Sequence, residues 1–210
     1  MLCFREVTEH MKTITILGAS GHGRVVADIA RLNGYDEILF LDDAEKEKCG
    51  SYDVIGKCSQ ALCMDTDIAI AIGNPDHRRA WFERLKEKNK PILIHPNAVI
   101  GEDVTIGEGT VIMAGAVLNP GCRVGKACIV NTCSSVDHDC ILGDYVHISV
   151  GAHLAGTVQI DDGTWVGAGA TISCNIHVVR DCLIGTGAVV VKDLTESGKY
   201  IGLPARLMES

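Results

Sequence analysis

Aliphatic side chains recur at every sixth position through the second half of the chain. Sixteen successive positions of this kind, from Ile100 to Val190, are all Ile, Leu or Val, without an insertion. The side chain two residues before each of them is small or aliphatic and points to the same side, because side chains two apart on a strand share a direction. Three short strands joined by turns close one coil of eighteen residues, and stacked coils share one core. The pattern therefore predicts a parallel β-solenoid.

The position after each aliphatic residue is often Gly, Asn or Asp, as at Gly101, Gly125 and Asn131. These residues adopt left-handed backbone conformations at the least cost, so we expect left-handed turns at these positions. Residues eighteen apart should stack, which divides the outward positions into three columns. The apolar column is Val111, Ile129, His147, Trp165 and Leu183. An outward apolar stripe marks a contact surface, and we expect it to face a neighbouring subunit.

The first half of the chain has a different periodicity. The residues from Thr13 to Tyr35 predict a buried strand, a glycine turn and a helix, and further strands are expected at 37–41, 67–73 and 91–95, with a charged helix over 75–88. Strands that alternate with helices in this way form a parallel sheet. We predict four segments: a loose extension over 1–11, a Rossmann-like domain over 12–95, the solenoid over 96–195 and a tail over 196–210.

The sequence Gly18-Ala19-Ser20-Gly21-His22-Gly23 follows the first predicted strand and opens the first helix. Ligands of parallel sheets bind at this edge, where backbone N–H groups of a helix face an anion. The order G-x-x-G-x-G differs from the dinucleotide fingerprint, so a purely structural glycine turn remains the alternative. Asp42 and Asp43 end the second strand, where they can contact a ribose or a base or, alternatively, cap a turn.

Composition narrows the classes of function. A net charge of −8 argues against nucleic-acid binding, which needs a basic surface. No apolar run approaches the ~18 residues of a membrane span, and no secretory leader is recognisable. The chain has ten cysteines, of which four occupy the small inward position of the repeat: Cys122, Cys128, Cys140 and Cys182. Thiols at such positions pack as small hydrophobic groups, so we expect a cytoplasmic protein without disulfides.

Three segments together resemble a known family. They are ILGASGHGRVVADIA, NTCSSVDHDCILGDYVHISVGAHLAG and YIGLPAR, which flank or belong to the repeat. The combination is similar to hexapeptide-repeat sugar acetyltransferases of the sialic acid O-acetyltransferase type, and most closely to those that N-acetylate a UDP-linked 4-amino-4,6-dideoxy sugar in the bacillosamine pathway. The resemblance implies a left-handed β-helix, a homotrimer with active sites between the prisms, acetyl-CoA as co-substrate and no metal.

The resemblance also implies roles for single residues. His138 matches the proposed general base, and Asp139, which stands where the relatives carry glutamate, would orient it. A histidine with a pKa near neutrality suits the removal of a proton from an attacking amine. Asn131 would contact the substrate or the developing oxyanion, and His147 would contact acetyl-CoA near its thioester. We expect His138 and His147 to approach more closely across a subunit boundary than within one chain.

The remaining expected contacts divide between the two substrates. Small residues of the late coils would line the pantetheine arm of acetyl-CoA, and the C-terminal segment would close over it: Gly156, Gly167, Ala168, Gly185, Thr186, Pro204 and Arg206. The glycine turn would hold the diphosphate of the acceptor and the two aspartates would bind its nucleoside: Gly18, Ser20, Gly21, His22, Gly23, Asp42 and Asp43. The acceptor is then a nucleotide-linked amino sugar.

Other functions remain open at this point. O-acetylation of sialic acid needs the same fold and base, and GDP-perosamine is a further possible acceptor. A different class is a zinc hydratase of the carbonic anhydrase type, but no two of His138, His147, His153 and His177 are a whole number of coils apart. A non-catalytic trimeric nucleotide-sugar sensor would bind ligand without turning over acetyl-CoA.

Overall fold

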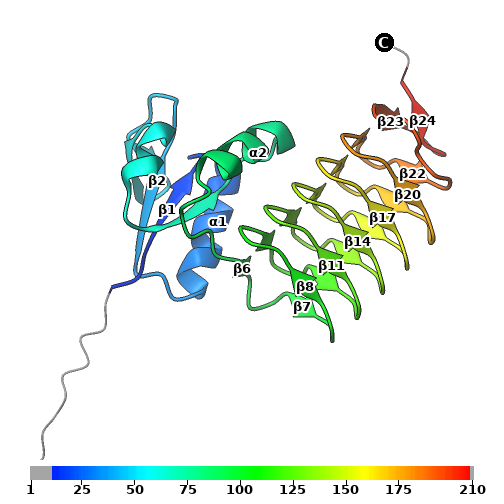
Figure 1. The fold of residues 1–210 in the computed structure, drawn as a ribbon, viewed down its shortest axis with the longest axis horizontal. Helices are drawn as coiled ribbons and strands as arrows, with labels where there is room; N and C mark the ends of the chain where they lie inside the picture. Colours follow the sequence, from blue (N-terminus) through cyan, green and yellow to red (C-terminus); the bar gives the residue numbers. More distant parts are fainter. Residues whose placement is uncertain (1–10, 209–210) are drawn as a thin grey trace, which may run out of the picture.

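The computed structural model describes residues 11–208 and contains two parts, an α/β domain and a long triangular β-solenoid (Figure 1). The expected N-terminal extension lies outside the described residues, except for Met11. The α/β domain packs beside the first coils of the solenoid, and the chain then winds away from it toward the C-terminus (Figure 1). The predicted fold class is confirmed.

The α/β domain contains one sheet of five strands in the order β3-β4-β2-β1-β5. Its strands are β1 (Thr13–Leu17), β2 (Glu37–Leu41), β3 (Lys48–Cys49), β4 (Tyr52–Gly56) and β5 (Asp67–Ile70), and its helices are α1 (Gly21–Leu32), α2 (Pro75–Arg84) and the 3₁₀ helix η1 (Cys58–Cys63). β1 pairs in parallel with both β2 and β5. The sequence predicted β1, α1, β2, β5 and α2 but left residues 42–66 irregular, where the structure forms β3, β4 and η1.

Three parallel sheets form the walls of the solenoid. The first wall is β6 (Leu93–Ile94), β9 (Val111–Ile112), β12 (Ile129–Val130), β15 (His147–Ile148), β18 (Trp165–Val166), β21 (Leu183–Ile184), β23 (Lys199–Ile201) and β24 (Arg206–Leu207). The second wall is β7 (Val99–Ile100), β10 (Val117–Leu118), β13 (Ser135–Val136), β16 (His153–Leu154), β19 (Thr171–Ile172) and β22 (Val189–Val190). The third wall is β8 (Thr105–Ile106), β11 (Arg123–Val124), β14 (Ile141–Leu142), β17 (Gln159–Ile160) and β20 (His177–Val178).

The predicted eighteen-residue register is confirmed along all three walls. Ile129 pairs with Val111 and with His147, and the other walls repeat this offset. The inward aliphatic side chains form one continuous core, in which the four repeat cysteines are at most 2% exposed. β6 pairs with β9, so the solenoid begins at Leu93, inside the range that the sequence assigned to the α/β domain. Its first wall also continues through β23 into the predicted tail.

The expectation of left-handed turns directly after each aliphatic residue was wrong. The backbone has positive φ two residues later, for example at Gly109, Ala127 and Asp139. A glycine directly after the aliphatic residue serves another purpose: a Cβ at Gly107 would lie 2.5 Å from backbone atoms of the next coil. Close stacking of the coils, and not a left-handed conformation, therefore selects glycine at these positions.

We expected the apolar outward column to face a neighbouring subunit, and over its first coils this was wrong. Val111 and Ile129 are 3% and 1% exposed and belong to one hydrophobic cluster with Ile14 and Ile29 of the α/β domain. His147 of the same column is buried as well, whereas Trp165 and Leu183 are half-buried. The first residues of this column are buried, as expected, but the α/β domain of the same chain buries them.

Arg78 on α2 joins the two parts of the molecule. Its guanidinium donates to the carbonyl oxygens of Ala127 and Tyr145 in the solenoid, at 2.7 and 2.5 Å, and to those of Ile72 and Gly73 at 2.9 and 2.8 Å. The side chain is 1% exposed, and burial lowers the pKa of its guanidinium to about 10. Because four carbonyl groups depend on it, Arg78 fixes α2 against the corner between the third and first walls.

Candidate active site

His138 lies on the corner between the second and third walls. Its Nδ1–H donates to Oδ2 of Asp139 at 2.9 Å, which leaves Nε2 as a proton acceptor. The imidazole is 56% exposed, and the hydrogen bond to Asp139, aided by the negative charge of Asp137, raises its pKa. The imidazole of His138 is thus exposed, and Asp139 holds it in one orientation.

Two glycines make room for this pair. A Cβ at Gly156, one coil after His138, would lie 2.4 Å from Nε2 of the imidazole. A Cβ at Gly121, one coil before Asp139, would lie 2.5 Å from Oδ1 of that carboxylate. Gly156 was assigned to acetyl-CoA from the sequence, and the structure places it directly against the imidazole ring.

A second hydrogen-bonded group holds the same corner. Oδ1 of Asp137 accepts from the backbone N–H of His138 at 2.8 Å and from Nδ2 of Asn119 at 2.7 Å. These hydrogen bonds lower the pKa of the Asp137 carboxyl. Asp137 therefore fixes the backbone of His138, while Asp139 orients its ring.

His147 and Asn131 lie on the first wall, away from His138. Nδ2 of Asn131 donates to Nε2 of His147 at 3.2 Å, and the imidazole stacks on Trp165 with ring centroids 5.0 Å apart. Burial, together with the positive charge of Arg78, lowers the pKa of His147 to about 3. His147 is therefore neutral, and its buried Nδ1 has no hydrogen-bond partner within residues 11–208.

The glycine turn divides into packing positions and an open one. A Cβ would lie 2.1 Å from a backbone oxygen at Gly23 and 2.7 Å from one at Gly18, which also has a φ of 103°. Gly21 meets nothing within 4 Å. Ser20 caps α1 through the N–H of Gly23, and the N–H groups of Gly21 and His22 begin the helix without an intrahelical acceptor. Free N–H groups at a helix N-terminus are the kind of donors that bind an anion.

His22 lies on the side of α1 that faces the solenoid. Burial, together with the charge of Arg78, lowers the pKa of its imidazole to about 4. Its Nε2 is buried and has no partner in the described part of the chain. Both Arg78 and His22 lie close enough to lower the pKa of His147, so the glycine turn and the first wall meet at this point.

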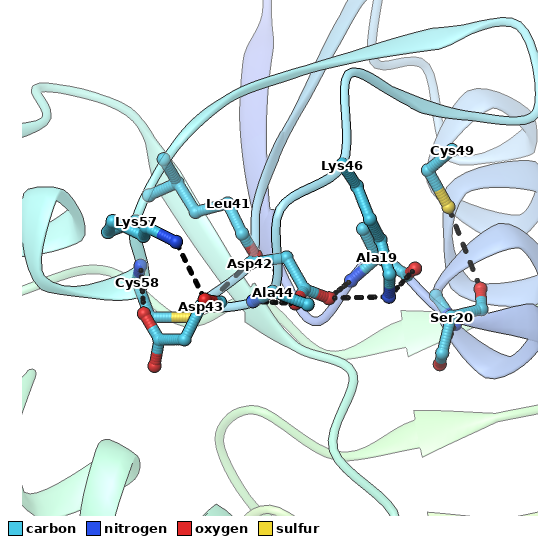
Figure 2. Close-up of polar contacts among 11 residues, drawn as sticks. Ala19, Ser20, Leu41, Asp42, Asp43, Ala44, Lys46, Cys49, Lys57 and Cys58 are labelled. Atoms are coloured by element: carbon cyan, nitrogen blue, oxygen red, sulfur yellow. Dashed lines mark hydrogen bonds and ion pairs between the residues drawn. The ribbon is translucent and has the colours of Figure 1, made fainter.

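The two aspartates after β2 have different contacts (Figure 2). Oδ2 of Asp42 accepts from the N–H of Ala19 at 2.7 Å and from Nζ of Lys46 at 3.2 Å, and its Oδ1 accepts from the N–H of Ala44. Burial alone would raise the pKa of Asp42, but these hydrogen bonds outweigh it and lower the pKa. Asp42 therefore holds the glycine turn through Oδ2 and its own loop through Oδ1.

Asp43 keeps one oxygen available. Its Oδ1 accepts from the N–H of Cys58 at 3.0 Å, and Figure 2 shows its other carboxylate oxygen without a contact. Lys46 also donates to the carbonyl oxygen of Ala19 at 2.8 Å, which places a cation beside the glycine turn. No sequence pattern indicated this lysine, because it stands in the stretch without periodicity.

The expected acetyl-CoA contacts fall on different corners of one chain. Gly167 and Ala168 lie between the first and second walls, and Gly185 and Thr186 stack on them one coil later. Gly156 lies with His138 on the next corner. The segment with Pro204 and Arg206 closes the C-terminal end, beside a cavity of about 370 Å³ that Lys192 and Arg206 help to line. One chain does not bring these three groups together.

Two further findings concern the described residues. Within residues 11–208, no three His, Cys, Asp or Glu side chains are grouped in a way that would hold a metal ion. No helix in that range is both long and apolar enough to cross a bilayer.

Comparisons with known proteins agree with this architecture. The family model "PglD N-terminal domain" matches residues 13–85, and "Bacterial transferase hexapeptide (six repeats)" matches residues 93–120. The GDP-perosamine N-acetyltransferase of Escherichia coli O157:H7 is 30% identical over 84% of this chain and 85% of its own. The chain belongs to the hexapeptide-repeat sugar N-acetyltransferases, and its solenoid is the left-handed β-helix of that family.

Solved structures of this family superpose over nearly the whole chain. The acetyltransferase domain of PglB from Neisseria gonorrhoeae is 37% identical with a TM-score of 0.91, covering 94% of this chain and 100% of that domain. PerB from Caulobacter crescentus, solved with CoA and GDP-perosamine, is 29% identical with a TM-score of 0.90, covering 95% and 99%. The PglB domain has also been solved with acetyl coenzyme A.

Proposed function

We propose that this protein transfers the acetyl group of acetyl-CoA to the 4-amino group of a nucleotide-linked 4-amino-4,6-dideoxy sugar. The observation that carries the proposal is the His138–Asp139 pair, in which Nδ1 is held by a carboxylate and Nε2 is accessible. The relatives named above, which act on amino sugars, support the same reaction. UDP is the nucleotide expected from the sequence, and GDP is the alternative that the perosamine enzymes favour.

In the proposed reaction, the neutral amine attacks the thioester carbonyl while Nε2 of His138 takes the amine proton. The tetrahedral intermediate then expels the CoA thiolate, which receives that proton from the imidazolium. Asp139 holds the imidazole in the tautomer that accepts at Nε2 and stabilises its charged form. No covalent enzyme intermediate is required.

We further propose that the site forms between two subunits of a homotrimer. The α/β domain covers the first wall, and His138 lies on the corner opposite that wall, so an acceptor held by one chain faces away from its own base. Exposed second and third walls remain for subunit contacts, with Ile141 41% exposed. A neighbouring chain would bring its His138 corner to the small residues at Gly167 and Gly185, along which acetyl-CoA would lie.

We propose that the protein acts in the cytoplasm. Its proposed substrates, acetyl-CoA and a nucleotide sugar, support this, and so do the free thiols of every cysteine within residues 11–208. His147 is buried, so its proposed contact with acetyl-CoA requires that binding of the ligand or of a neighbouring subunit exposes one edge of the imidazole. The same holds for the proposed contact of Asn131, which is hydrogen-bonded to His147.

A thiol-release assay with acetyl-CoA and a panel of UDP- and GDP-linked 4-amino sugars, with free sialic acid as a further acceptor, tests the proposal. We expect His138→Ala to lower kcat by about 100-fold or more. His177→Ala is the matched control, because His177 forms a similar exposed pair with Asp161 at 3.0 Å on the third wall. Full activity of His138→Ala, or turnover of sialic acid alone, would refute the proposed function.

A further inference from the structure

The inward thiols of Cys122 and Cys140 are hydrogen-bond donors as well as core side chains. Sγ of Cys122 lies 2.9 Å from the carbonyl oxygen of Asp137 in the next coil, and Sγ of Cys140 lies 3.2 Å from that of Ala155. Both thiol side chains are fully buried. Within residues 11–208, no backbone N–H donates to either carbonyl oxygen. Each thiol therefore supplies the donor that its carbonyl group does not find in the backbone.

The same contact recurs with hydroxyl groups at equivalent positions of the repeat. Oγ1 of Thr110 donates to the carbonyl oxygen of Gly125 at 2.8 Å, and Oγ1 of Thr164 donates to that of Val179 at 3.0 Å. In each case the acceptor stands fifteen residues after the donor, as it does for the two thiols. A thiol is a weak donor, but this recurring geometry identifies the contacts as hydrogen bonds.

The two thiols hold the corner that carries His138 from the inside of the solenoid. One of the two carbonyl groups belongs to the residue directly before His138, and the other belongs to the residue directly before Gly156. The imidazole lies against Gly156, where a Cβ would come within 2.4 Å of Nε2. One thiol thus fixes the peptide group that leads into His138, and the other fixes the backbone on which its ring rests.

Cys128 makes the same kind of hydrogen bond on a different corner. Its Sγ lies 3.1 Å from the carbonyl oxygen of Gly143, between the third and first walls, and its side chain is 1% exposed. His138 lies on the corner between the second and third walls. The chain therefore contains two thiols with matched burial and bonding, of which Cys122 supports the His138 corner and Cys128 does not.

We propose that Cys122 and Cys140 are positioning residues for acetyl transfer, which keep His138 aligned with Asp139 from inside the core. The inference rests on the proposed function, because both thiols act through the base named there. Nδ1 of His138 and Oδ2 of Asp139 are 2.9 Å apart, and this alignment requires that the backbone of the corner keeps its shape. Both thiols are buried beneath the corner, so they act without touching a substrate.

The pKa of His138 depends on this alignment. The hydrogen bond to Asp139 raises the pKa, and the charge of Asp137 and the nearby thiol of Cys122 raise it further. A corner that loosens weakens the hydrogen bond to Asp139, so the pKa falls toward its ordinary value. Because the proposed base acts only when neutral, the acidic limb of kcat/KM then moves to lower pH.

Three variants test the inference in the thiol-release assay. Cys122→Ala removes one donor, and we expect kcat to fall by about 10-fold with the acidic limb at lower pH, since a misplacement of about 1 Å can cost about 100-fold. Cys122→Ser keeps a donor at the same position and should restore most of kcat. Cys128→Ala is the matched control, and it should lose a similar amount of thermal stability while kcat and the acidic limb stay unchanged.

Thermal unfolding midpoints show that each variant is folded at the assay temperature. Equal kcat values and equal acidic limbs for Cys122→Ala and Cys128→Ala would overturn the inference. A Cys122→Ser variant that is no more active than Cys122→Ala would also overturn it, because the hydrogen bond would then not be the cause.

A measurement without substrates separates this inference from the proposed function. If the wild-type protein releases no CoA with any acceptor, the proposed function fails. The rate at which diethyl pyrocarbonate modifies His138, followed by peptide mass mapping at several pH values, still gives the pKa of its imidazole. A lower pKa in Cys122→Ala than in Cys128→Ala would support the hold on His138, and equal values would refute it.

Discussion

The imidazole of His138 and the carboxylate of Asp139 are neighbours in sequence and hydrogen-bonded at 2.9 Å. Consecutive side chains on a strand point to opposite faces, but Asp139 has a left-handed φ of 57°. This conformation turns its carboxylate back toward Nδ1 of His138. A corner of the solenoid thus brings an imidazole and a carboxylate together from two adjacent residues.

Asp139→Asn should shift the pH dependence of the reaction. The hydrogen bond to Asp139 is the largest contribution that raises the pKa of His138, and the base acts only when neutral. Activity therefore increases as pH rises through this pKa, and the variant's acidic limb should move to lower pH, with a lower plateau because the ring is no longer oriented. The measurement is kcat/KM against pH. An acidic limb that stays in place would show that another group titrates.

Gly156→Ala should damage catalysis without unfolding the protein. The new methyl group would lie 2.4 Å from Nε2 of His138, so the ring must turn away, and a displacement of about 1 Å can cost about 100-fold in rate. Gly73→Ala is the matched control, since a Cβ there meets nothing within 4 Å and the backbone is not left-handed. We expect a lower kcat only for Gly156→Ala, measured by CoA release, with similar unfolding midpoints for both. Normal turnover by Gly156→Ala would contradict this tight fit.

Arg78→Met should destabilise the junction of the two domains. The change leaves four carbonyl groups without their donor, at a cost of about 3 kcal/mol or more of unfolding free energy. Arg79→Ala is the control, because the ion pairs of Arg79, such as 3.5 Å to Asp181, are exposed and worth about 0–1 kcal/mol. Its other contact is with the Tyr145 ring, 5.1 Å from the guanidinium carbon. Urea unfolding and limited proteolysis near residue 90 measure the difference. Equal midpoints for the two variants would exclude the proposed clamp.

The cysteines should differ in their reactivity toward an alkylating reagent according to their position in the repeat. Cys133 and Cys174 are exposed, whereas Cys128 and Cys182 are buried. Burial raises the pKa of Cys128 to about 12, so its reactive thiolate is scarce at neutral pH. Peptide mass mapping after brief alkylation should find the first two modified in the native protein and the other two only in urea. Rapid native labelling of Cys128 would indicate that the coils open readily.

The sequence predicted most of the solenoid because each coil repeats the same local pattern. Aliphatic residues at a fixed spacing determine the walls, and stacking places residues eighteen apart side by side, as observed for Ile129 and His147. His138 stays a predicted base, identified from its motif, and its hydrogen-bond partner Asp139 stands next to it in sequence. Contacts between residues that are close in sequence, or that the repeat places side by side, could therefore be predicted.

The features that were not predicted from the sequence depend on contacts between segments far apart in the chain. Arg78 is one of several charged residues on α2, and only the docked solenoid shows that it is buried. The column through Val111 and Ile129 was correctly expected to be covered, but periodicity does not distinguish a neighbouring subunit from the chain's own α/β domain. Likewise, Asp42 and Asp43 are indistinguishable in sequence, and their different roles follow from Ala19 and Cys58.

The register of the walls restricts the lengths of insertions and deletions that such a chain can accommodate. Because neighbouring strands pair at an offset of eighteen residues, a deletion of one whole coil preserves every column, whereas a loss of six residues moves all later residues by one wall. His138 would then turn by about 120° around the prism axis relative to the domain that Arg78 anchors. Natural insertions between them are thus confined to complete coils or to loops that bulge outward from a corner.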